Sequence, residues 1–166
     1  MLARTATLDA GKVAAAPAGD WTSQASKAIA RAEYRFCAVP GGGWSAPNRT
    51  QGLRLTVDGS VAQVSPRKES GTSWSLRLGL RAIGREGAMV AVAPGKVRAE
   101  GNRIEQRRDD LGLSEWYVNI RSGIEQGFTI DRRPAAGEKD SPLVLDIAYE
   151  GGLEARQDER HGAILF

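Results

Sequence analysis

The sequence predicts an all-β protein, an antiparallel β-sandwich of the jelly-roll or immunoglobulin-like class with one short helix and an extended arm at the N-terminus. Apolar and polar residues alternate over many short segments, which is the period of half-buried strands. Turn signals separate these segments about every 8–12 residues. The 20 glycines among 166 residues suit a chain with many tight turns.

Length and composition limit the classes of protein. A chain of 166 residues with 41% hydrophobic and 26% charged residues is expected to be a globular domain. No run approaches the roughly 18 apolar residues of a membrane span, so we expect no membrane insertion. The 23 basic and 20 acidic residues are interspersed, so we expect no nucleic-acid partner.

The first 20 residues are read as an extended arm or linker. They are rich in Ala, Thr and Gly, and Asp9 and Lys12 interrupt the apolar stretch, so they do not form an intact signal peptide. If this arm pairs with anything, we expect it to pair as a strand. Residues 21–166 are read as a single β-sandwich domain, either whole or a fragment of a longer chain.

A short helix and a first strand are expected next. Thr22 or Ser23 can cap a helix over residues 24–33, where alanines carry high propensity but the apolar stripe is weak. The alternation over residues 34–38 then favours a strand that ends at Pro40.

Residues 41–50 are read as a loop, because three glycines and a proline interrupt any ladder. Trp44 in this loop is either an exposed platform for a sugar or a plug packed onto the end of the sandwich. Asn48, Arg49 and Thr50 fit the N-glycosylation pattern, which acts only in a glycosylating secretory pathway.

The rest of the chain is read as strands. Residues 53–57 and 61–65 are joined by a turn at Asp58-Gly59, and residues 74–82 form the clearest half-buried strand, with Leu80 among the inward residues. Shorter or less regular strands are expected at 89–93, 97–99, 103–108, 143–149 and 163–166.

Residues 113–130 are read as a hairpin with its turn at 121–123. In the first strand Trp116, Val118 and Ile120 share one face, opposite mostly polar residues. In the second strand Ile124, Gln126, Phe128 and Ile130 share one face. A buried amide needs partners, so we expect Gln126 to satisfy backbone groups.

Three segments resemble the N-terminal β-rich domain of large secreted bacterial surface proteins that precedes FG-GAP-type propeller repeats. They are residues 46–54, 114–119 and 123–130. The resemblance implies an extracellular or cell-surface setting and a role in assembly or adhesion, and it brings no catalytic residues. No propeller repeats follow, and the family domain continues with further strands. We therefore expect either that the chain is a processed or cloned fragment or that a missing strand comes from another chain.

The sequence offers little for catalysis, and we expect neither an enzyme nor a cofactor or metal site. Cys37 and His161 are each the only residue of their type, and we expect a buried thiol and an exposed imidazole rather than a catalytic pair. Glu115 and Glu125 could face each other across the hairpin like a glycosidase pair, but solvated carboxylates beside Arg121 and Arg107 are the commoner arrangement. Asp109, Asp110 and Asp140 lack the spacing of a calcium loop.

Two functions therefore remain as hypotheses. The first is a non-catalytic surface domain that works in assembly, with other copies or downstream modules of the same chain as partners, by strand addition or module packing. The alternative is a carbohydrate-binding or adhesin module. In that module Trp44 and Tyr117 would stack on a glycan, and Asn48, Arg49 and Glu115 would make polar contacts.

Overall fold

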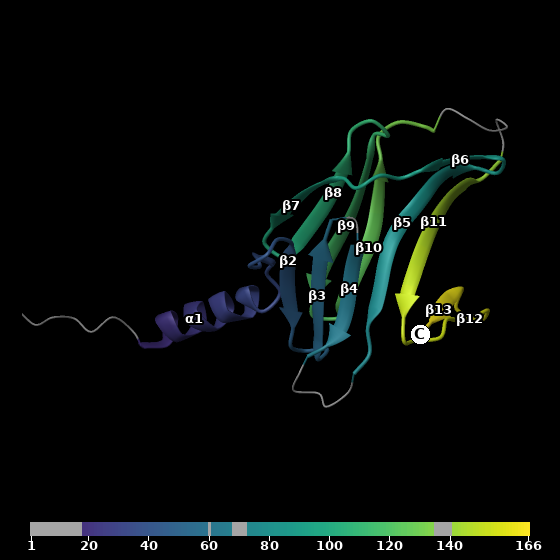
Figure 1. Cartoon of the computed structure of the whole chain (residues 1–166). Coiled ribbons are helices and arrows are strands. Elements are labelled where there is room, and N and C mark those ends of the chain that lie inside the picture. Colours follow the sequence, from purple (N-terminus) through teal and green to yellow (C-terminus); the bar gives the residue numbers. More distant parts are fainter. Residues whose placement is uncertain (1–17, 60, 68–72, 135–140) are drawn as a thin grey trace, which may run out of the picture.

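A computed structural model describes residues 18–59, 61–67, 73–134 and 141–166. The expected arm, apart from its last three residues, and Asp140 lie outside the described residues. The fold is mostly antiparallel β with one helix, as expected (Figure 1). We call its two larger sheets sheet A and sheet B.

Sheet A has seven strands in the order β1-β2-β3-β4-β5-β11, and β6 also pairs with β5. The first five strands form a meander, and β11 returns to pair with β5 along its whole length. The strands are β1 (Cys37–Ala38), β2 (Trp44–Asn48), β3 (Leu53–Asp58), β4 (Val61–Pro66), β5 (Leu76–Arg85), β6 (Ala88–Ala91) and β11 (Leu143–Gly151).

Sheet B has four strands in the order β10-β9-β8-β7, again an antiparallel meander. Its strands are β7 (Lys96–Glu100), β8 (Arg103–Arg108), β9 (Leu113–Ile120) and β10 (Gly123–Ile130). A separate hairpin of β12 (Arg156–Asp158) and β13 (Ala163–Leu165) follows β11.

The two sheets share buried side chains. In one cluster Leu55 and Val57 of sheet A pack with Ile104 and Tyr117 of sheet B. In the other, Leu80 and Ile83 of β5 pack with Leu113 of β9, and half-buried Phe128, Ile130 and Leu145 complete it. The shared clusters thus place sheet B face to face with sheet A. In the view of Figure 1, β9 passes behind the β2–β4 region and β10 is visible between β4 and β5.

The helix α1 (Ala18–Ala32) is longer than expected and extends away from the sheets (Figure 1). Trp21 and Ile29 are exposed on it. A hydrogen bond between the hydroxyls of Tyr34 and Thr50 joins the segment after the helix to strand-bearing parts of the chain. Among the described residues, no helix has the length and apolar character needed to cross a membrane.

The predicted loop over residues 41–50 was wrong in its second half, because Trp44–Asn48 is strand β2. The glycines at 41, 42 and 43 all have positive φ and confine the turn to themselves. Pro47 is tolerated because β1 pairs with β2 only at Trp44 and Ser45, so β2 is an edge strand at the proline.

In two strands the residues that face the core differ from those predicted by the alternation of apolar and polar residues. An extra residue, Arg81, bulges out of β5 opposite Asp146 and Ile147, so both Leu80 and Ile83 face the core. On β9 the buried face is the mostly polar one, which carries Glu115, Tyr117 and Asn119. Trp116 lies on the opposite face, against Gly127 and beneath the guanidinium of Arg103 at 4.5 Å.

Candidate functional site

The most unusual feature of the interior is a group of polar side chains on the inner face of sheet B, which we call the buried cluster. It consists of Gln106 and Arg108 on β8, Glu115 and Tyr117 on β9, and Gln126 on β10. Strand alternation puts all five on one face, and the register places Gln126 opposite Tyr117 and Gln106 opposite Glu115.

Glu115 is the centre of the buried cluster. Its Oε1 accepts hydrogen bonds from Tyr117 at 2.7 Å and Gln126 at 2.9 Å, and its Oε2 accepts one from Arg108 at 3.4 Å. The side chains of Arg108 and Glu115 are only 2% and 0% exposed. A buried carboxylate thus has a buried cation and two neutral donors as partners, which is the arrangement that burial of charge requires.

Hydrogen bonds to Ala93 and Gln106 also hold Arg108 in place. Its Nε donates to the carbonyl of Ala93 at 2.8 Å, and a terminal nitrogen donates to Oε1 of Gln106 at 3.0 Å. The Nε2 atom of Gln106 is buried and has no hydrogen-bond partner among the described residues. Gln126 bonds Glu115 and the hydroxyl of Tyr117 rather than the backbone groups expected for it.

The position of Tyr117 gives a testable consequence for pH. Burial and the neighbouring Glu115 carboxylate raise the pKa of Tyr117 far above its usual value near 10. Above about pH 10 the unfolded chain therefore releases the phenolic proton of Tyr117, while the folded chain keeps it. The contribution of Tyr117 to the free energy of unfolding is present below that pH and is lost as pH rises. While folded, the protein and its Tyr117→Phe variant should show the same phenolate absorbance change at 295 nm between about pH 9 and 11. A larger change in the parent protein, without unfolding, would contradict this burial.

A pair of asparagines ties the two sheets together at the other end of β9. Asn48 Nδ2 donates to Oδ1 of Asn119 at 2.9 Å and to the carbonyls of Ile120 and Gly123. Asn119 Nδ2 in turn donates to the carbonyls of Tyr34 and Pro47. Both side chains are fully buried, so the glycosylation pattern at Asn48 is inaccessible in this fold.

The residues expected to contact a ligand do not form one surface. Trp44 is half-buried and packs against the first core cluster, which agrees with the plug interpretation. Asn48, Glu115 and Tyr117 are buried with their polar atoms in internal hydrogen bonds, so Tyr117 is not an exposed stacking ring. Arg49 alone is exposed, near Glu33 at 3.9 Å.

The described residues do not assemble the arrangements considered for catalysis or metal binding. Glu115 pairs with Phe128 and Glu125 with Val118, which places the two carboxylates on opposite faces of sheet B. Asp109 receives hydrogen bonds from Lys96 and Arg107, which lower the pKa of its carboxyl. Among the described residues, no three His, Cys, Asp or Glu side chains gather as metal ligands.

The prediction of a buried thiol was wrong, because Cys37 is exposed on β1. This strand has only two residues, and its neighbour Phe36 enters the core instead. His161 is exposed as expected, with its Nδ1 2.8 Å from Asp158 in the turn between β12 and β13.

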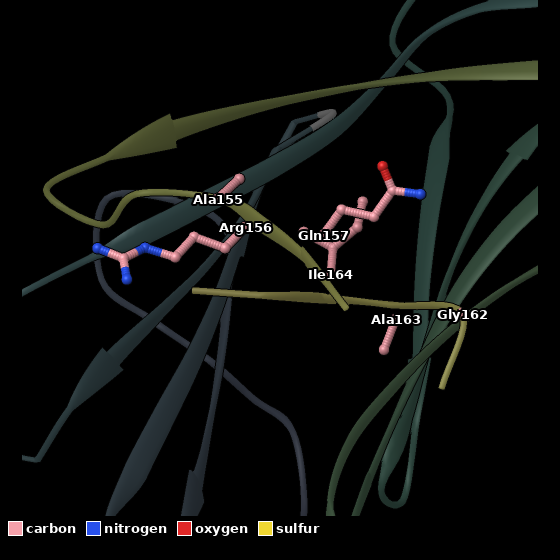
Figure 2. A pocket seen from close by; sticks show the side chains of 6 residues that line it. All are labelled: Ala155, Arg156, Gln157, Gly162, Ala163 and Ile164. Atoms are coloured by element: carbon pink, nitrogen blue, oxygen red, sulfur yellow. The ribbon is translucent and has the colours of Figure 1, made fainter. Parts of the chain in front are cut away.

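Two hollows of several hundred Å³ lie on the described surface. One, of about 540 Å³, lies on the β12–β13 hairpin, where Arg156 and Gln157 extend in different directions (Figure 2). The other, of about 450 Å³, lies between the β5–β6 turn and the segment after β10. The guanidinium of Arg132 on its wall is bonded to the carbonyls of Asp109 and Asp110. Neither hollow brings a nucleophile and a base together.

The side of the molecule formed by β10 and β11 is incomplete. β10 is the last strand of sheet B, and its inward residues Ile124, Gln126, Phe128 and Ile130 are only half-buried. On β11, Leu145 reaches the core, but Ile147 and Tyr149 on the same face are 38% and 50% exposed. β11 thus extends beyond the last strand of sheet B, and no described strand of sheet B lies opposite its inner face, where the ring of Phe166 after β13 contacts Tyr149, edge to face at 5.4 Å between centroids. Figure 1 shows this overhang of β11.

Comparison with family models, with curated proteins and with solved structures gives no match for this chain. The residues and their geometry are therefore the basis for any assignment of function.

Sequence reasoning missed Gln106 and Arg108 of the buried cluster, and it missed Asn119. The sequence of β8 contains a signal for this cluster, because Gln106 and Arg108 follow the apolar residue Ile104 at intervals of two and so lie on the same face of the strand. Polar residues in phase with an apolar face indicate a buried polar network when a neighbouring strand carries matching ones, here Glu115 and Tyr117 on β9.

Proposed function

We propose that the chain is a non-catalytic β-sandwich domain, open along its β10–β11 side, that acts in assembly by accepting a strand. The observation that carries this proposal is the half-covered β10 beside the exposed apolar residues Ile147 and Tyr149 of β11. Unpaired strand edges next to apolar surface recruit further strands. The extracellular or cell-surface setting is part of the proposal and rests on the resemblance of residues 46–54, 114–119 and 123–130.

The edges of the two sheets differ in how well they are protected against pairing. β1 and β6 are short, with two and four residues, and β7 carries the charged residues Lys96, Arg98 and Glu100 in alternation. β11 bears Asp146 and Glu150, which pair with arginines of β5. β10 has eight residues, and Glu125 is its only ionisable one. Charges, prolines and short strands are the usual protection of an edge, so β10 is the least protected.

The inward polar residues favour a structural rather than a catalytic role for the interior. The buried cluster is enclosed between the sheets, and Glu115 is engaged by Arg108, Tyr117 and Gln126. The glycan-binding alternative loses its stacking residues, because Tyr117 is buried and Trp44 packs against the core. No observation on the described surface favours it over assembly.

Hydrogen exchange measured at several protein concentrations tests this function. If a strand is accepted at the β10–β11 side, those backbone amides of residues 123–130 that point away from β9 should exchange at least about tenfold more slowly at high concentration than at low concentration, because the alternate amides already bond β9. Amides of β3, which lies inside sheet A, provide the internal control and should not change. Equal exchange of residues 123–130 at all concentrations would argue against an accepted strand.

A further inference from the structure

The open side of the molecule has the shape of a sandwich that lacks one strand. β5 lies opposite β10, since Leu80 and Ile83 pack in the same cluster with Phe128 and Ile130. β11 lies beyond β5 in sheet A, and no described strand lies opposite it in sheet B. A fifth strand beside β10 would pair with its free backbone groups and cover Ile147 and Tyr149 of β11.

The overhang of β11 limits what can fill this position. Pairing of β10 with β10 of a second copy would join the two B sheets into one continuous sheet, and both A sheets would lie on the same face of that sheet. Because β11 extends past β10 in each copy, the two β11 strands would then occupy overlapping space. A single extended segment has no such conflict, so the position suits a donated strand.

The chain itself contains a segment suited to this position, in residues 2–10. This segment has nine residues against the eight of β10, and it contains the β-branched Thr5 and Thr7. With strand spacing, four of the five residues on one of its faces are apolar: Leu2, Ala6, Leu8 and Ala10, with Arg4 as the exception. That face would lie against β11.

The position of the helix favours donation to a neighbouring copy. α1 joins the body next to β1 and β2, at the edge of sheet A opposite to β11, and a salt bridge of 3.9 Å links Glu33 to Arg49 there. Its 15 residues lead the chain about 22 Å away from the sheets (Figure 1). The N-terminal end of α1 at Ala18 therefore lies far from the β10–β11 side of its own copy.

We propose that residues 2–10 of one copy add as a fifth strand beside β10 of a neighbouring copy and cover Ile147 and Tyr149 of its β11. This inference rests on the proposed function and adds the identity of the donor and of the acceptor. Because the donating and accepting surfaces differ, the contact is heterologous and generates open-ended chains of subunits.

Two full-length variants that each lose one half of the contact provide the test. Leu8→Asp places a charge on the apolar face of the arm and leaves the acceptor intact. Ile147→Lys places a charge on the exposed acceptor face and leaves the arm intact. Each variant alone should be a monomer of about 17.8 kDa by light scattering, and an equimolar mixture should form a dimer and nothing larger. The unmodified chain should form larger species under the same conditions.

Controls separate loss of contact from loss of fold. Val90→Lys changes an equally exposed apolar residue, 47% exposed, on β6 outside the acceptor, and it should assemble like the unmodified chain. Tyr149→Lys and Thr7→Pro serve as second acceptor and donor variants, and circular dichroism checks that each is folded. If the unmodified chain and both single variants form the same large species, assembly stands and the arm contact is overturned. If the unmodified chain is a monomer, the proposed function itself fails. A mixture that remains monomeric while the unmodified chain assembles also overturns the arm contact.

Discussion

Replacing Glu115 by alanine is expected to lower the free energy of unfolding by about 3–5 kcal/mol, because it leaves the buried cation Arg108 without its carboxylate. The hydroxyl of Tyr117 and the amide of Gln126 also lose their acceptor. Urea titration followed by tryptophan fluorescence measures the change, since a two-state transition converts the midpoint into a free energy.

A matched substitution on the other face of sheet B controls for the loss of a carboxylate. Glu105 forms a solvent-accessible salt bridge with Arg103 at 3.5 Å, so Glu105→Ala should cost less than about 1 kcal/mol. Replacing both members of the buried pair, with Arg108→Met and Glu115→Leu, should recover much of the loss, since no unpaired charge remains. A Glu115→Ala variant as stable as Glu105→Ala would contradict the role of the buried pair.

The second large effect is expected at Asn48. Asn48→Asp keeps the size of the side chain but removes the donor that bonds Asn119, Ile120 and Gly123. It places a buried carboxylate opposite three oxygen acceptors, and we expect a loss of about 3–5 kcal/mol at neutral pH. The loss should diminish as pH falls, because the protonated acid is neutral and regains one donor.

Gln51→Glu is the matched control for this amide. Gln51 lies three residues after Asn48, in the turn between β2 and β3, and its side chain donates an exposed hydrogen bond to the carbonyl of Arg121 at 3.0 Å. Its replacement by an acid should cost less than about 1 kcal/mol, because water can solvate the new charge. Equal losses for the two variants, measured by thermal unfolding at several pH values, would show that Asn48 is not the critical link between the sheets.

Strand alternation predicted most of the individual strands, because the period of two is visible in the sequence itself. Residues 103–108 match β8 in both bounds, and the turn at residues 121–123 separates β9 from β10 as expected. The direction of a face is less visible. On β9 the bulky apolar residues Trp116, Val118 and Ile120 are outside, and Glu115 and Tyr117 are inside.

This reversal has a physical reason that lies outside the strand. Glu115 is stable inside because Arg108 on β8 and Gln126 on β10 complete its hydrogen bonds, and these strands meet β9 only in the folded sheet. Trp116 is stable outside because Gly127 leaves room for its ring and Arg103 covers it. A pattern read along one strand contains neither fact, so the candidate ligand residues Glu115 and Tyr117 were placed on the wrong side.

The exposed side of β11 also could not be predicted from the pattern along one strand. Ile147 and Tyr149 alternate with polar residues like core residues, and their exposure follows only from the position of β11 beyond the last strand of sheet B. The sequence predicts strands, whereas the open side is a property of how many strands each sheet contains.

The mass of the full 166-residue chain as a function of concentration, measured by light scattering after size exclusion, tests the central claim most directly. Assembly through the open β10–β11 side predicts masses that rise above the 17.8 kDa of one chain toward multiples of it as the concentration increases. A folded protein with a mass of 17.8 kDa at every concentration would contradict the claim.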